Sequence, residues 1–97
     1  MSKNSTIPNH QKAYFPPSQI TILRTSTICK KRGRSRSSHY ADIKAGLFVK
    51  PILIGLRATG IPDYEVDALI AARIAGKSDD EIRALVIKLE SARKAAA

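Results

Sequence analysis

The sequence predicts a small, mostly α-helical domain with one short β-hairpin. Three observations lead to this fold class. Apolar residues recur at helical spacing in the second half of the chain, residues that start and stop helices stand at the ends of these runs, and one β-branched stretch contains a Gly-first pair that suits a hairpin turn. With 97 residues the chain predicts a single domain with a thin core, because a domain this small buries only about 60% of the surface of its unfolded chain.

The N-terminal segment predicts no regular structure. Residues 1–18 are polar, end in Pro16-Pro17 and show no hydrophobic period, so we expect a disordered tail. The apolar residues Ile20, Ile22 and Leu23 follow, and they form either a short strand or the approach to a helix.

Residues 25–32 predict a first short helix, with Ile28 and Cys29 facing inward. Gly33 ends it, because glycine readily adopts the left-handed conformation that follows a helix. Ser35 suits the N-cap of a second helix over residues 36–45, since its hydroxyl can accept a hydrogen bond from a free backbone N–H of the first turn. Two short helices joined by a tight glycine-containing turn form a helix-turn-helix.

At 3.6 residues per turn, the second helix has two different sides. The packing side carries His39 and Ile43, and Asp42 lies close enough along the helix for a local hydrogen-bonded pair with His39. The other side is polar and basic, and it carries Arg36, Ser37, Tyr40 and Lys44.

The stretch KPILIGLRATGIP predicts the hairpin. β-Branched residues flank Gly55-Leu56, a pair suited to a type II′ turn. We place the strands at residues 51–54 and 57–61, with Arg57 at the tip.

Two longer helices complete the predicted fold. The third begins at Pro62-Asp63 and ends at Gly76, and the fourth covers residues 79–94, after a capping box formed by Ser78 and Glu81. Each has a stripe of apolar residues: Val66, Leu69, Ile70 and Ile74 in the third helix, and Ile82, Leu85, Val86 and Leu89 in the fourth.

The positive charge is concentrated in the first part of the chain. Residues 1–61 carry eleven Lys and Arg and one acid, a net charge of +10, whereas residues 62–97 carry six basic residues and seven acids, a net charge of −1. This asymmetry is typical of a polyanion-binding face joined to a neutral scaffold.

Several classes of protein are disfavoured. The two histidines, the single Cys29 and the scattered carboxylates have no metal-ligand spacing, and there is no phosphate-binding glycine loop or nucleophile–base pair, so we expect no enzyme, no metal and no cofactor. No segment approaches the roughly 20 apolar residues of a membrane span, and the N-terminus lacks the apolar run of a signal peptide. We therefore expect no membrane partner and a cytoplasmic location.

Several motifs form a series along the chain: GRSRSSHY at residues 33–40, Ile54-Gly55 with Arg57-Ala58, and AARIAGKS at residues 71–78. This series resembles the AlpA family of prophage-type transcriptional regulators over residues 20–78. The resemblance implies a winged helix-turn-helix of the kind shared with excisionases and MerR-type regulators, which binds DNA and switches genes of a prophage or integrative element.

Two positions depart from the AlpA pattern. Ile61 stands where the family usually has Trp, and Val49 stands where it usually has Pro. The loss of a large Trp predicts a hairpin that packs more loosely against the third helix. The expected organisation is a winged helix-turn-helix domain over residues 19–76 and a C-terminal amphipathic helix over residues 77–97.

The resemblance and the charge pattern together predict a sequence-specific transcriptional regulator that binds double-stranded DNA. We expect the helix at 36–45 in the major groove and the hairpin at 51–61 as the wing. Arg36 is the candidate base contact, because a guanidinium can pair with guanine O6 and N7, and Arg57 is expected to enter the adjacent minor groove or to contact its rim. The other expected contacts, mostly to phosphates, are Arg34, Ser35, Ser37, Ser38, Tyr40, Lys44 and Lys50.

Two further expectations concern the rest of the chain. Lys30, Lys31, Arg32 and Arg34 are expected to supply sequence-independent attraction to DNA. The apolar stripe of the fourth helix either completes the core or pairs with a second copy. We favour a homodimer, because small regulators commonly lengthen a short site by two-fold pairing.

Three alternatives stay open. One is an excisionase-like accessory factor in site-specific recombination, which binds and bends DNA. A small RNA-binding or ribosome-binding protein is permitted by size and basicity, although the aromatic residues form no stacking platform. The third is a protein-interaction module that works through residues 62–97.

Overall fold

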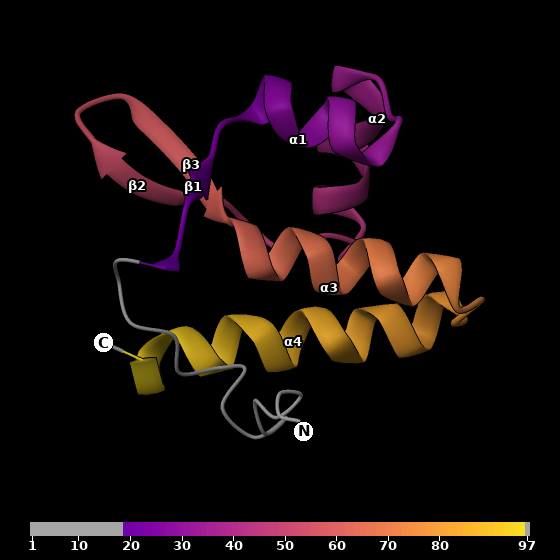
Figure 1. The fold of residues 1–97 in the computed structure, drawn as a ribbon. Helices are drawn as coiled ribbons and strands as arrows, with labels where there is room; N and C mark the ends of the chain where they lie inside the picture. The colour runs from indigo at the N-terminus through magenta and orange to yellow at the C-terminus, as the bar shows by residue number, and fades with distance from the viewer. Residues whose placement is uncertain (1–18, 97) are drawn as a thin grey trace, which may run out of the picture.

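The structure is a computed structural model that describes residues 19–96, and it is mostly helical with one small antiparallel sheet (Figure 1). The tail predicted over residues 1–18 lies outside the described residues. Along the chain the elements are β1 (Ile22–Leu23), α1 (Thr25–Arg32), α2 (Arg36–Lys44), β2 (Ile52–Gly55), β3 (Ala58–Pro62), α3 (Asp63–Ile74) and α4 (Asp79–Ala96).

The predicted helix ends are largely confirmed. Gly33 follows α1 at φ 68, a left-handed conformation that costs glycine little because it has no Cβ. The capping box before α4 is present: the Ser78 amide donates to Glu81 Oε1 at 2.8 Å, and the Glu81 amide donates to Ser78 Oγ at 3.2 Å. Helix α4 continues to Ala96, two residues beyond the predicted end.

The sheet has the strand order β1-β3-β2, so the apolar residues before α1 form a strand. Leu23 pairs with Ile61 and Ile22 pairs with Pro62. A side chain at Gly60 would collide with Ile22 and lie 2.9 Å from the Leu23 carbonyl oxygen. The close approach of β1 to β3 therefore requires glycine at this position.

The predicted hairpin turn is one residue too early. Leu53 pairs with Thr59 and Gly55 pairs with Ala58, so β2 contains one extra residue, a β-bulge, before the turn. The bulge moves the turn from Gly55-Leu56 to Leu56-Arg57. Arg57, and not Gly55, takes the left-handed conformation, at φ 62.

The core is formed jointly by the loop after α2, the sheet and the helices α1, α3 and α4. Helix α4 runs beside α3, on the side away from α2 and the hairpin (Figure 1). It buries Ile82 and Val86, while Leu85 and Leu89 pack partly buried against the core. The apolar stripe of α4 thus folds back within the chain. The buried apolar residues are Ile28, Phe48, Val49, Ile61, Val66, Leu69, Ala72, Ile82 and Val86.

Three apolar positions that the sequence singles out differ in their burial. Ile61 and Val49, the departures from the AlpA pattern, are both buried. Ile74 was predicted as part of the apolar stripe of α3, but it is exposed because it is the last residue of that helix, beyond the packed part of the stripe. Within residues 19–96, no helix has the length and apolarity that a membrane crossing requires.

Candidate nucleic-acid interface

Helix α2 turns a polar and basic face to solvent. Arg36, Ser37, Tyr40 and Lys44 are exposed and His39 on the other side is buried, as the helical projection predicts, and Asp42 is buried as well. Neither Arg36 nor Lys44 forms a hydrogen bond or ion pair with another described residue. Both cations are therefore available to an external anion.

The first turn of α2 is fixed by serine side chains. Ser35 is the N-cap, and its Oγ accepts a hydrogen bond from the Ser38 amide at 3.1 Å. The same hydroxyl lies 2.9 Å from Ser38 Oγ and donates to it. Ser35 and Ser38 thus hold the helix start, while Ser37 is exposed and has no such contact with another described residue.

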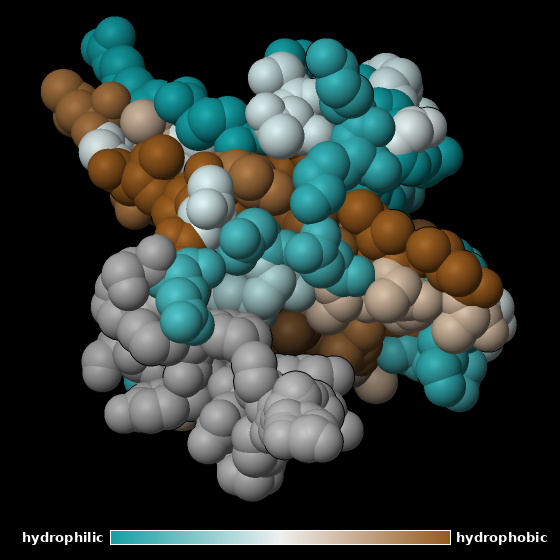
Figure 2. Space-filling view, in the orientation of Figure 1, coloured by the Kyte–Doolittle hydropathy of each residue, from teal (hydrophilic) through white to brown (hydrophobic). Residues whose placement is uncertain are grey.

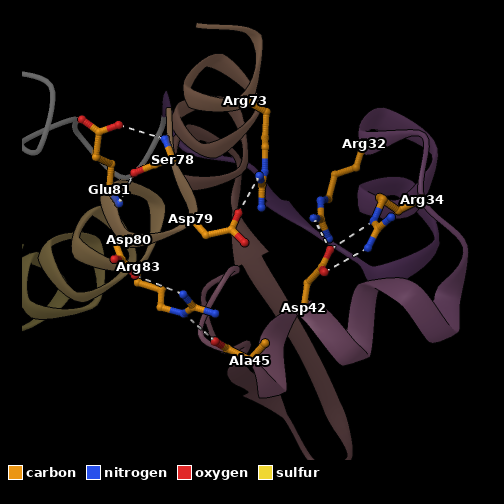
Figure 3. A network of polar contacts seen from close by, with 10 residues as sticks. All are labelled: Arg32, Arg34, Asp42, Ala45, Arg73, Ser78, Asp79, Asp80, Glu81 and Arg83. Atoms are coloured by element: carbon orange, nitrogen blue, oxygen red, sulfur yellow. Dashed lines mark hydrogen bonds and ion pairs between the residues drawn. The ribbon is translucent and has the colours of Figure 1, made fainter. Parts of the chain in front are cut away.

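The one acid of α2 is neutralised inside the molecule by two arginines (Figure 3). Arg32 Nη2 donates to Asp42 Oδ2 at 2.6 Å, and Arg34 donates to both carboxylate oxygens, from Nε at 3.1 Å and from Nη2 at 2.9 Å. We call these three residues the Asp42 cluster. It joins α1 and the turn to α2, so it fixes the angle between the two helices.

The Asp42 cluster also decides the charge of the exposed face. Burial alone would raise the pKa of the Asp42 carboxyl, but hydrogen bonds from Arg34 and Arg32 outweigh burial and hold that pKa below its usual value. Asp42 therefore stays ionised and paired at neutral pH. Its negative charge is paired with Arg32 and Arg34. Arg36 and Lys44 are therefore the charges of α2 that a ligand meets.

The predicted pair between His39 and Asp42 is replaced by contacts of both residues with Arg32. Arg32 Nη1 lies 2.8 Å from His39 Nδ1. Since a guanidinium only donates, Nδ1 accepts and the ring proton is on Nε2. His39 also meets the Phe48 ring edge to face at 5.2 Å, and Arg32 lies 4.1 Å from the centre of that ring. Burial, followed by the charge of Arg32, lowers the pKa of His39, so it is neutral at pH 7.

Most of the basic residues between Lys30 and Arg34 are paired with acids of the chain. Lys31 Nζ contacts Asp67 Oδ1 at 2.8 Å, and the side chain of Arg32 is only 8% exposed. The expectation of general attraction is therefore wrong for Arg32, because its charge is buried and paired. Of this run, Lys30 alone has no bond to another described residue.

The hairpin projects on the same side of α3 as α2 (Figure 1). Arg57 is exposed at its tip, as predicted, and Lys50 is exposed at its base. Figure 2 shows hydrophobic surface gathered over the hairpin. The exposed apolar residues there are Leu53, Ile54 and Leu56.

Helix α4 holds both ends of the segment that links α2 to the hairpin. Near the end of α2, Arg83 Nε donates to the Ala45 carbonyl at 3.0 Å (Figure 3). At the base of the hairpin, the Lys50 amide donates to Glu90 Oε2 at 2.8 Å, and the Lys50 carbonyl accepts from Arg93 Nη2 at 2.8 Å. The link therefore has fixed ends, and the distance between α2 and the hairpin depends on α4.

Arg93 is itself fixed by a buried acid. Its Nη2 and Nε donate to the two carboxylate oxygens of Glu65 at 2.6 and 2.9 Å. Glu65 is fully buried, and its hydrogen bonds raise the pKa of Arg93. This two-point contact holds the end of α4 against the start of α3 and so supports the Lys50 contacts.

The sequence predictions missed two groups of residues. The α4 contacts join residues about forty positions apart, and no local pattern marks such pairs. The exposure of Leu56 had a signal, because it was already placed in the hairpin turn, where side chains meet solvent.

A cleft of about 550 Å³ opens beside the Asp42 cluster. Leu47, Phe48 and Ile70 form part of its apolar wall, and Arg73 and Asp79 stand at its polar edge. Within the described part of the chain, no three His, Cys, Asp or Glu side chains gather in a way that could hold a metal ion.

No protein-family model, no curated protein and no solved structure matches the chain. The resemblance to the AlpA family therefore stays a prediction from the motifs.

Proposed function

We propose that this protein is a sequence-specific transcriptional regulator that binds double-stranded DNA and controls genes of a prophage or integrative element. In this proposal α1 and α2 form a helix-turn-helix, α2 enters the major groove, and the β2–β3 hairpin is the wing. The single observation that carries the proposal is the exposed face of α2, where Arg36 and Lys44 are unpaired among the described residues while Asp42 is buried in its own cluster.

The dimensions of α2 suit the major groove. Nine residues at 1.5 Å each give a helix of about 14 Å, and the groove of B-DNA is about 12 Å wide. In helix-turn-helix proteins the first residues of the second helix meet the base edges. Arg36 is the first residue of α2, so its guanidinium is the proposed base contact, and Lys44 at the other end is the proposed phosphate contact.

The Asp42 cluster gives this face a defined orientation. A helix that moved freely against α1 would present Arg36 to many base steps and distinguish them poorly. Arg32 and Arg34 join α1 and the turn to α2 through four hydrogen bonds to Asp42 and His39, each at most 3.1 Å long. This arrangement supports discrimination between sequences in addition to general attraction.

An excisionase-like accessory factor is the second candidate. It is favoured by the exposed apolar residues of the hairpin, since a protein that shapes DNA beside a recombinase uses apolar side chains against the groove. An RNA-binding role has less support. Among the described aromatic residues, Phe48 is buried, whereas Tyr40 on α2 is exposed. The ring beside Tyr40 is that of His39, which is buried, so the two do not form a stacking platform in solvent.

Selection of bound duplexes from a random DNA pool tests the proposal. The full chain should enrich one short motif, because one helix meets only a few base pairs. Recovery of all sequences equally, at a strongly salt-dependent affinity, would show non-specific binding alone. Failure to retain any duplex would overturn the proposed function.

A further inference from the structure

The tip of the hairpin exposes apolar side chains to water. Leu56 in the turn is 95% exposed, and Leu53, three residues earlier on β2, is 78% exposed. Exposed apolar surface is unfavourable in water, and the turn also holds Arg57 in a left-handed conformation that side chains rarely adopt. Exposed apolar side chains gathered on one projecting hairpin are typical of a contact with a partner.

The charge around this tip indicates the chemistry of the partner. No acid occurs between Asp42 and Asp63, whereas Lys50 and Arg57 are exposed on the hairpin. An apolar tip with one cation beside it and a second at the base of the hairpin complements a surface whose apolar groups lie between rows of negative charge. The minor groove of DNA has this arrangement, with stacked bases between two rows of phosphates.

We propose that the wing inserts the Leu56 side chain into the minor groove as a wedge between neighbouring base pairs and thereby bends the bound DNA. This inference rests on the proposed function. Apolar wedges of this kind partly unstack a base step and kink the duplex by about 20–90°. Arg57 beside the wedge contacts the groove or its phosphates, and Leu53 covers the opened step.

The base of the wing is held in place by the rest of the chain. The Lys50 amide and carbonyl are both bonded to α4, through Glu90 and Arg93. On the other side of the hairpin β1 lies close against Gly60, where no side chain separates the two strands. A wedge must push against a fixed support, and these contacts provide one.

The experiment measures DNA bending by energy transfer between dyes at the two ends of a duplex of about 30 base pairs that carries the selected motif. The wild-type protein should raise the transfer efficiency. Leu56→Ala, measured at a concentration that saturates the duplex, should lose most of the bend. Because Leu56 is almost fully exposed, this change removes no packing within the chain. Ile87→Ala is the matched control. Ile87 is also an exposed apolar residue, at 66%, but it lies on α4 and not on the hairpin.

Each outcome has a defined meaning. A straight duplex with bound wild-type protein, or equal bending by Leu56→Ala, overturns the wedge while DNA binding stands. If Leu56→Ala instead changes the sedimentation of the DNA-free protein and leaves bending intact, the tip is a contact between copies and the wedge is wrong. If the wild-type protein retains no duplex, the proposed function fails, and the wedge fails with it.

Discussion

Asp42 and Glu65 are both buried carboxylates held by arginine, but they fix different parts of the proposed interface. Asp42 takes its hydrogen bonds from α1 and the turn just before α2, within ten residues of sequence, and it sets the position of α2. Glu65 is bonded to Arg93, 28 residues away, and Arg93 in turn holds the base of the hairpin. The proposed recognition helix is thus fixed locally, whereas the proposed wing is fixed by the C-terminal helix.

This comparison changes the role of α4. Its apolar side chains complete the core, and its polar side chains reach Ala45 after α2 and Lys50 before β2. A helix at the end of the chain therefore determines how far the proposed wing stands from the proposed recognition helix.

The largest loss of stability is expected when Glu65 loses its arginine partner. Arg93→Ala leaves Glu65, which is fully buried, without its partner, and the loss of such a partner costs about 3–5 kcal/mol. Urea denaturation should show a free energy of unfolding lower by this amount. Lys94→Ala is the control, because Lys94 is an exposed neighbour of the same charge, and its effect should stay within about 0.5 kcal/mol. Equal, small losses in both variants would show that the Glu65–Arg93 pair does not stabilise the fold.

A smaller loss of stability is expected when Asp42 loses its charge. Asp42→Asn keeps the shape of the side chain but removes the charge that faces Arg32 and Arg34, and a hydrogen bond to a charged group contributes about 1.5–3 kcal/mol. We expect a loss of about 2 kcal/mol on the same urea measurement. The variant should also discriminate less between the selected motif and other duplexes, since α2 is less well fixed. A variant as stable and as selective as the wild type would contradict the structural role of the cluster.

The smallest effect is a dependence of stability on pH. The pKa values of His39 and Asp42 are both lowered in the folded chain, so the unfolded chain binds more protons at low pH. The contribution of His39 is therefore complete above its ordinary pKa of 6.5 and is lost as the pH falls below it. That of Asp42 is complete above its ordinary value of 3.8 and is lost below that. The free energy of unfolding should begin to fall between pH 7 and 5, and His39→Gln should remove this first decline. A flat profile in the wild type between pH 7 and 5 would show that protonation of His39 does not oppose folding.

The residues that bound the helices were predictable because their signals are local. Gly33, Ser35 and the pair of Ser78 and Glu81 act on backbone groups within three or four residues, so their spacing is visible in the sequence. The exposed face of α2 followed from helical geometry alone.

The remaining features depend on contacts that a single sequence does not display. The bulge at Ile54 moved the turn, and nothing in the local sequence marked it. Arg32 looked like one more surface cation, but the fold places Asp42, His39 and Phe48 around it. These features arise from tertiary packing, which overrides local preference.

The central claim is that the exposed face of α2 distinguishes DNA sequences through Arg36. The most direct measurement compares the affinities of wild type, Arg36→Ala and Lys88→Ala for the selected duplex and for a scrambled duplex of the same composition. Lys88 is an exposed cation of α4, so its removal controls for the loss of one charge. A bidentate base contact contributes about 1–3 kcal/mol of discrimination, so Arg36→Ala should reduce the preference for the selected duplex by about 5- to 150-fold, and Lys88→Ala should leave it unchanged. If Arg36→Ala weakens both duplexes equally and keeps the preference, Arg36 contacts phosphate and the claim is contradicted.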